Sequence, residues 1–308
     1  MCKVVHLLRS VPPEWCQQAL EDFDTCIRTE FARGTGILFD DDAYAQVSLP
    51  IDLGGMGLRL ATKHASAAYI ASVARCAAAD SWPRESAPGW SEAVADFCDL
   101  TLWTPDIIRS PLKPLQQHSL SKAVDKSSFA ALVGKSSLFN KARLLCVRGA
   151  GAGSWLAAVP SKALNSTFDP REFTTLLRFW LGMPFYEQEC ACPWCGACQD
   201  PHGYHALVCK KTGLKVKRHN GLREVFLEYC KMGQVDAERE TAGLLPDSSE
   251  RPADILLRGC DSSRLKIPNF SGNSPVCLDL RSPTPSKSNT SNVLVWSLAL
   301  PLKTTSLR

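Results

Sequence analysis

Seven cysteine and histidine residues gather within the twenty positions 190–209. Zinc is held by four soft or borderline ligands in a tetrahedron, and a Cys-x-x-Cys turn places two thiolates on one side of the ion. Cys192 and Cys195 form such a turn, and Gly196 directly after it permits a tight backbone. His205 and Cys209 lie four positions apart, so one helical turn brings them onto the same face. The spacing therefore predicts a zinc site with Cys192, Cys195, His205 and Cys209 as ligands.

The exact ligand set stays open at this point, because the cluster holds three further donors. They are Cys190, Cys198 and His202. Cys195 and Cys198 also have the Cys-x-x-Cys spacing. A redox motif of the thioredoxin type is the competing interpretation, but it needs a strand-to-helix setting, which the proline and glycine inside the cluster disfavour.

Cysteine usage along the rest of the chain bears on the compartment. The chain has fourteen cysteines, a number that in a small secreted domain would indicate disulfides. The apolar start is too short for a signal-peptide core before Pro12, and no stretch approaches the roughly 18 apolar residues of a membrane span. We therefore expect an intracellular chain, in the nucleus or cytoplasm, without a membrane partner, in which clustered cysteines are metal ligands.

A run of positive charge follows the cluster directly. The net charge of the chain is only +4 and does not by itself indicate a polyanionic partner. Six basic residues nevertheless fall within fourteen positions, with no acid among them: Lys210, Lys211, Lys215, Lys217, Arg218 and Arg223. A solvated helix face is one interpretation. Beside a zinc site, a phosphate-binding surface for DNA or RNA is the favoured one, and no small-molecule substrate is expected.

Two aspartates near the end of the chain suggest a second kind of site. Asp254 stands directly before an apolar run, and Asp279 lies inside another, so both belong to predicted strands. Metal-dependent nucleases hold magnesium with carboxylates on adjacent strands, and the 25-residue spacing allows a hairpin or a short loop. Many folds place aspartates at strand ends, so this pattern alone does not separate a catalytic pair from a structural one.

Two further motifs have structural interpretations. The aspartates at 40–42 predict a solvated turn or a helix cap rather than a magnesium site, because nothing nearby supplies a phosphate cradle. The glycines at 54–57 lack the following Lys-Ser/Thr of a phosphate loop and predict a tight turn between two apolar segments.

Helical patterns dominate the sequence before the cluster. Apolar residues recur every three to four positions in residues 11–33, where Pro12 and Pro13 suit the first turn. Further helices are expected at 61–79, once after Ser91, and at 171–182, where Gly182 can end the helix; 120–148 is basic and weakly amphipathic. From Lys287 onward the chain is rich in Ser and Thr and aperiodic.

Several segments, in order, resemble one family. They are Leu49-Pro-Ile-Asp-Leu-Gly-Gly-Met-Gly-Leu-Arg59, His64-Ala-Ser-Ala-Ala-Tyr-Ile-Ala-Ser72, Gly153-Ser-Trp-Leu-Ala-Ala-Val-Pro-Ser161, the cluster ending at Cys209, Arg218-His-Asn220 and Arg251-Pro-Ala-Asp254. Together they resemble the region after the polymerase core in reverse transcriptases of non-LTR retrotransposons, over roughly residues 11 to 285. In that family a zinc knuckle precedes a restriction-like endonuclease domain that nicks target DNA.

The resemblance implies roles for particular residues. Asp254 would match the first catalytic aspartate and Asp279 the acid of the second strand, with Arg281 where related nucleases keep lysine and Glu240 as a weaker acidic candidate. The chain has no Tyr-x-Asp-Asp polymerase signature, and an aperiodic tail replaces the basic helix expected after the second strand. We therefore expect no polymerase activity and little or no nuclease activity from this chain.

The expected fold is α+β in five parts: a helical post-polymerase, thumb-like region (1–115), a helical connector (116–186), a CCHC-type zinc module (187–215), a truncated restriction-endonuclease-like remnant (216–290) and an irregular tail (291–308). The expected function is zinc-dependent binding of DNA or RNA. The alternatives are a magnesium-dependent DNA-nicking endonuclease and a protein-interaction domain with structural zinc.

Overall fold

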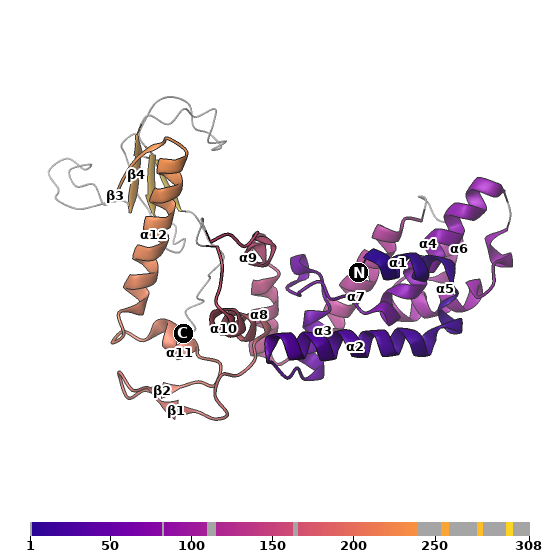
Figure 1. Ribbon diagram of the computed structural model, residues 1–308, viewed down its shortest axis with the longest axis horizontal. Helices are drawn as coiled ribbons and strands as arrows, with labels where there is room; N and C mark the ends of the chain where they lie inside the picture. Colours follow the sequence, from indigo (N-terminus) through magenta and orange to yellow (C-terminus); the bar gives the residue numbers. More distant parts are fainter. Residues whose placement is uncertain are drawn as a thin grey trace. The chain divides into compact units, whose positions relative to one another are not determined.

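The computed structural model describes residues 2–81, 83–109, 115–162, 166–239 and 254–258, and the backbone alone of 276–279 and 294–297. The chain forms two compact units, Met1–Phe185 and Tyr186–Arg308 (Figure 1). The described part is mostly helical, and two small sheets belong to the second unit. The chain is therefore of the α+β class.

The first unit is built of helices around α4. Its elements are α1 (Cys2–Ser10), η1 (Pro13–Trp15), α2 (Gln17–Thr35), α3 (Asp41–Val47), η2 (Ile51–Leu53), α4 (Ala61–Asp80), η3 (Arg84–Ser86), α5 (Trp90–Leu100), α6 (Pro105–Arg109), α7 (Gln117–Lys135), α8 (Leu138–Val147), α9 (Ser154–Ala157) and α10 (Pro170–Leu181). Helices α1, α2, α5 and α7 all pack on α4. The many alanines of α4 allow this, because small side chains let several neighbouring helices approach one helix closely.

Two of the predicted helices are confirmed almost to the residue. The alanine-rich segment forms α4, and the segment before Gly182 forms α10. At the start of α10, Asp169 and Glu172 form a capping box, while Gly182 ends the helix with a left-handed φ of 67°. Both ends of α10 are therefore set by residues within the helix and its caps.

The first predicted helix begins later than expected. Pro13 opens the 3-10 turn η1, and α2 begins only at Gln17, because Cys16, with φ −129° and ψ 18°, lies outside the helical region. The preceding residues form α1, which the sequence did not predict. Its Leu8 is buried with Leu20 and with the alanines at the start of α4. Packing against α4 thus stabilises a helix too short to form by itself.

The aspartates at 40–42 and the glycines at 54–57 have the structural roles predicted for them. Asp40 caps α3 and accepts a hydrogen bond from the backbone N–H of Ala43 at 2.7 Å. Gly54 and Gly57 have left-handed φ values of 84° and 76°. A Cβ atom on Gly55 would lie 1.9 Å from the carbonyl oxygen of Leu49, so only glycine fits this turn.

Residues on both sides of position 115 share one core. Leu120 and Val124 of α7 are buried in the same cluster as Ile70 of α4 and Phe97 of α5. Helices on both sides of position 115 therefore contribute to one packed cluster. The boundary between the two compact units lies between residues 185 and 186.

The second unit begins with a short ribbon and ends with a four-stranded sheet. Its elements are β1 (Cys190–Ala191), β2 (Cys198–Gln199), α11 (Tyr204–Val208), α12 (Leu214–Met232), β3 (Asp236–Arg239), β4 (Ile255–Arg258), β5 (Val276–Asp279) and β6 (Leu294–Ser297). The large sheet has the order β3-β4-β5-β6, with antiparallel pairing except for the parallel pair β5 and β6. Helix α12 packs on β3, with Leu227 and Cys230 buried.

The two strands predicted around the aspartates are confirmed as β4 and β5. The tail from Lys287 is not irregular throughout, because residues 294–297 form β6. This four-residue segment, Leu-Val-Trp-Ser, is rich in residues that favour strands. It pairs with the edge of β5. In the part of the chain that the structure describes, no helix is long and apolar enough to cross a membrane.

Candidate metal centre

The first half of the metal centre is a hairpin turn. Strands β1 and β2 pair antiparallel, with Cys190 opposite Gln199. Between them, the backbone N–H of Cys192 donates to the carbonyl of Ala197, and the N–H of Gly196 donates to the carbonyl of Cys192, both at 2.8 Å. Gly196 has a left-handed φ of 73°, which its lack of a Cβ atom allows. This turn holds Cys192 and Cys195 on one side of the hairpin.

The second half is a single helical turn organised by Asp200. One oxygen of its carboxylate accepts hydrogen bonds from the backbone N–H groups of His202 and Tyr204, at 3.0 and 3.1 Å, and the other from that of His205, at 2.7 Å. These bonds fix the start of α11. The N–H of Cys209 donates to the carbonyl of His205 at 2.8 Å, which places the two residues one turn apart.

The four predicted ligands converge. Cys192 Sγ lies 4.0 Å from Cys209 Sγ, and Cys195 Sγ lies 3.2 Å from His205 Nε2. All four donor atoms lie within 4.8 Å of one another. Zinc–sulfur bonds of about 2.3 Å in a tetrahedron require sulfur atoms about 3.8 Å apart. The Cys3His group can therefore hold a metal ion with small adjustments, and its donor chemistry fits zinc.

Hydrogen bonds within the turn lower the pKa of one of the four thiol and imidazole groups. The backbone N–H of Trp194, followed by that of Cys195 and by the His205 side chain, lowers the pKa of Cys192 from its usual 9.0 to about 6. These donors stabilise the thiolate, which is the form that binds a metal. The lowered pKa of Cys192 therefore favours the form of this side chain that binds a metal.

The donors left open by the spacing do not join the group. The thiol of Cys198 donates to the carboxylate of Glu189 at 3.1 Å, and this hydrogen bond raises the pKa of Cys198, which keeps it protonated. Cys190 lies exposed on β1. The thioredoxin interpretation is also disfavoured, because Cys192 and Cys195 lie in a turn between two strands.

The basic run lies between α11 and the first turns of α12. Lys210, Lys211, Lys217 and Arg218 are exposed. The side chain of Lys215 lies outside the described residues. Helix α12 has no acid in its first turn, so positive side chains stand where the helix dipole is also positive. This arrangement is unfavourable unless an anion binds nearby.

Arg223 does not belong to this exposed surface. Its side chain is only 7% exposed and its guanidinium lies 3.2 Å from the carboxylate of Glu224. Like Leu227 and Cys230 of the same helix it is buried, which sets it apart from the exposed basic residues, and its contact with phosphate stays a prediction. The sequence of the basic run does not show which of its side chains become buried when α12 packs against strands that come later in the chain.

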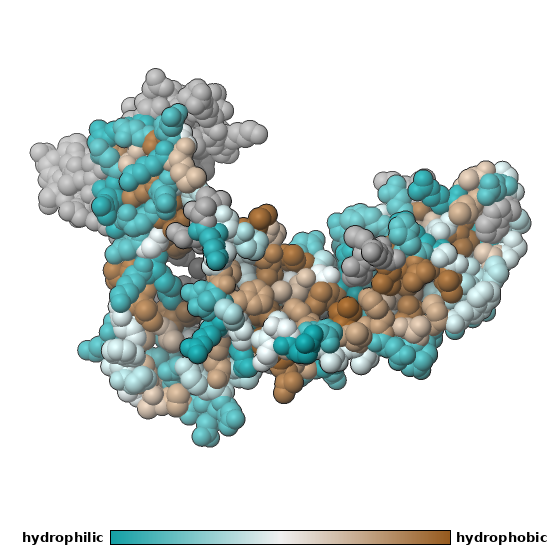
Figure 2. Space-filling view, viewed as in Figure 1, coloured by the Kyte–Doolittle hydropathy of each residue, from teal (hydrophilic) through white to brown (hydrophobic). Residues whose placement is uncertain are grey.

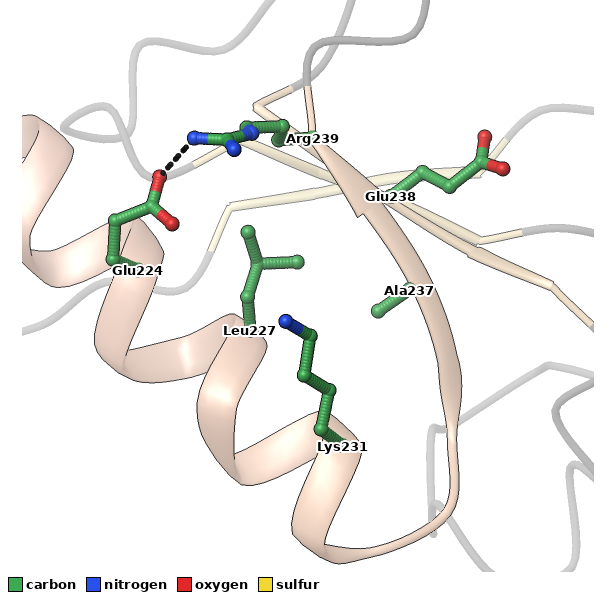
Figure 3. A pocket seen from close by; sticks show the side chains of 6 residues that line it. All are labelled: Glu224, Leu227, Lys231, Ala237, Glu238 and Arg239. Atoms are coloured by element: carbon green, nitrogen blue, oxygen red, sulfur yellow. Dashed lines mark hydrogen bonds and ion pairs between the residues drawn. The ribbon is translucent and has the colours of Figure 1, made fainter.

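The other end of α12 carries balanced charge. An open hollow of about 440 Å³ between α12 and β3 is lined by the residues labelled in Figure 3, among them Glu224, Lys231, Glu238 and Arg239. Arg239 pairs with Glu224 at 3.1 Å, and Glu238 pairs with Arg258 at 2.8 Å. Figure 2 shows hydrophilic residues, in teal, over this part of the unit. Within the described part of the unit, exposed basic residues that pair with no described acid thus lie at the start of α12, whereas its other end carries paired charges.

The two predicted catalytic aspartates lie at neighbouring strand positions. Ile255 of β4 pairs with Leu278 of β5, and continuing this register by one residue sets Asp254 opposite Asp279. Asp254 is buried, and His219 of α12 places its Nε2 3.0 Å from one carboxylate oxygen. Sequence reasoning assigned no role to His219, although it lies inside the Arg218-His-Asn220 segment. Glu240 and Arg281 lie outside the described residues.

The fold and the site together define a helical unit, followed by a small module whose Cys3His group could hold a metal ion, and a sheet. No protein-family model, no curated protein and no solved structure matches the chain.

Proposed function

We propose that this chain is a zinc-dependent nucleic-acid-binding protein, a fragment of a retroelement reverse transcriptase polyprotein without polymerase activity of its own. The observation that carries the proposal is the convergence of Cys192, Cys195, His205 and Cys209 directly beside an exposed basic surface. Zinc contributes folding energy to such small modules, and here it holds in place the segment that leads into the lysines.

The basic surface supports a polyanionic partner. Lys210 and Lys211 directly follow the metal ligand Cys209, and the next basic residues occupy the first turns of α12. Side-chain charge and helix dipole have the same sign there, so a phosphate group relieves repulsion as well as gaining attraction. The retroelement part of the proposal rests on the sequence segments that resemble non-LTR retrotransposon reverse transcriptases.

Charge reversal tests the nucleic-acid proposal. The triple variant Lys210→Glu, Lys211→Glu and Lys217→Glu should lose most binding to a labelled oligonucleotide, and wild-type affinity should fall steeply with salt because counterions are released on binding. The matched control reverses exposed basic residues of the first unit: Lys122→Glu, Lys126→Glu and Arg171→Glu. Equal losses in both triples, or an affinity that ignores salt, would show that no specific surface binds nucleic acid.

A DNA-nicking endonuclease is the second candidate function. Asp254 and Asp279 at paired positions are the minimum that a magnesium-activated water needs. The contact of His219 with Asp254 fixes the direction of that carboxylate. Our first proposal expects no nicking of supercoiled plasmid by the purified chain with magnesium or manganese. Nicking that Asp254→Asn removes would establish the second function in its place.

A further inference from the structure

A hollow of about 360 Å³ lies beside the metal centre. Cys192 and Cys209 line it, whereas Cys195 and His205 do not. The hollow therefore lies against one side of the metal group and is not the space between the four ligands. Its size is at the lower end of the range of about 300–1,000 Å³ typical of small-ligand pockets.

Two aromatic side chains line the hollow and remain accessible. Trp194 is 69% exposed and Tyr186 is 43% exposed. Trp194 lies in the turn between two metal ligands, so the backbone hydrogen bonds that shape the metal centre also fix its position. An exposed tryptophan held on a rigid turn provides a flat surface on which a planar ring can stack.

One buried polar side chain also faces the hollow without a partner. Gln199 is only 7% exposed and lines the hollow. Its side-chain amide makes no hydrogen bond to any residue that the structure describes, although the amide has two donor hydrogens and one acceptor oxygen. The nitrogen and oxygen of this amide are not among the fully buried side-chain atoms without a partner in the described residues, so they are open to a ligand that offers both a donor and an acceptor.

Two exposed lysines lie in the chain between residues that line the hollow. Cys209 and Thr212 both line the hollow, and the two residues between them are the exposed lysines Lys210 and Lys211. A ligand with its ring in the hollow would therefore carry its anionic group next to these lysines. Stacking surface, amide and adjacent cations together match one nucleotide of a polynucleotide strand.

We infer that this hollow, lined by Trp194, Tyr186 and Gln199, is a subsite for one unpaired base of single-stranded DNA or RNA. The base stacks on the aromatic rings, and the amide of Gln199 pairs with its hydrogen-bonding edge. Every base has a neighbouring donor and acceptor on that edge, so the subsite requires an unpaired base rather than a particular one. The inference rests on the proposed nucleic-acid binding and names its substrate class.

The test compares three probes of equal length with the zinc-loaded full-length chain: a mixed-sequence single strand, the same backbone without bases, and a duplex. Each is prepared as DNA and as RNA. Base stacking should make the intact single strand bind about 5- to 150-fold more tightly than the abasic strand. Trp194→Leu and Gln199→Leu should each reduce this preference, whereas Trp194→Phe should keep most of it.

The controls separate failure of the subsite from failure of the proposed function. Trp15→Leu changes an equally exposed tryptophan, 66% exposed, in the first unit and should have no effect. Zinc content shows whether each variant keeps the metal centre. If intact, abasic and duplex probes bind equally, the subsite is absent but nucleic-acid binding stands. If no probe binds, the proposed function fails as well.

Discussion

The pairing of each cysteine with its nearest neighbours decides its role. Cys195 lies against the imidazole of His205, whereas Cys198 donates to the carboxylate of Glu189. An imidazole nitrogen can bind the same metal ion as a thiolate, whereas a carboxylate that accepts a hydrogen bond from a thiol favours the protonated thiol, which does not bind a metal. Cys195 and Cys198 both belong to Cys-x-x-Cys pairs in the sequence. Their different neighbours give the two thiols different chemistry.

This contrast gives a prediction for the metal content. Cys195→Ser should reduce bound zinc from about one ion per chain to nearly none, because three ligands hold zinc far more weakly than four. Cys198→Ser should leave the zinc content unchanged. Metal analysis of the purified variants is the measurement. Loss of zinc in Cys198→Ser with retention in Cys195→Ser would replace the ligand set given above.

The convergence of the four donor side chains could be predicted from the sequence because their geometry is local. A Cys-x-x-Cys turn and a pair four positions apart each fix their own donor directions. The contact of His219 with Asp254 and the burial of Arg223 could not be predicted in this way. Both depend on α12 packing against a sheet whose strands come later in the chain. Gln199 likewise becomes a candidate only when the hollow around it is known.

Among the helices and strands too, local sequence signals made an element predictable, and dependence on distant contacts did not. Helix α10 carries its own capping box and terminating glycine, and α4 its own alanine-rich pattern. Helix α1 has neither and is ordered by the burial of Leu8. Strand β6 follows a segment without periodicity and is ordered by pairing with β5. Elements with local signals could be predicted, and elements held by distant partners could not.

The turn at Gly54 to Gly57 offers a stability test of the first unit. Gly55→Ala would place a Cβ atom 1.9 Å from the carbonyl oxygen of Leu49 and 2.6 Å from that of Gln46. Both neighbours are backbone atoms, so the turn must shift, and we expect the free energy of unfolding to fall by about 2 kcal/mol or more.

Thermal and urea unfolding of the variant measure this loss. The control is Gly34→Ala in α2, where a Cβ atom meets nothing within 4 Å. That change should be neutral or stabilise by up to about 1 kcal/mol, because alanine favours a helix more than glycine does. Equal stability of Gly55→Ala and wild type would show that the turn is looser than described.

At the scale of the whole molecule, the chain divides into a unit with its own helical core and a unit that contains the metal centre. The first unit buries Phe97, Ile70 and Leu120 without any metal ligand among them. The metal-binding module, by contrast, has only two-residue strands and a five-residue helix. Elements this short are not stable without an added constraint.

Removal of the metal should therefore affect the two units differently. After chelation, amide hydrogen exchange should rise in peptides covering residues 186–213 and stay unchanged in peptides from α4. Hydrogen exchange followed by mass spectrometry resolves the two regions. Equal increases in both would mean that the metal supports the whole chain, and no increase in either would mean that the module does not need it.

We propose that metal binding and nucleic-acid binding belong to one module of the chain. The most direct measurement is the affinity of the full chain for a labelled single-stranded oligonucleotide, taken with zinc bound, after chelation, and after zinc is returned. We predict that chelation removes most of the affinity, that zinc restores it, and that magnesium does not. Unchanged affinity in the metal-free protein would contradict the account, because the lysines would then bind nucleic acid without the structure that positions them.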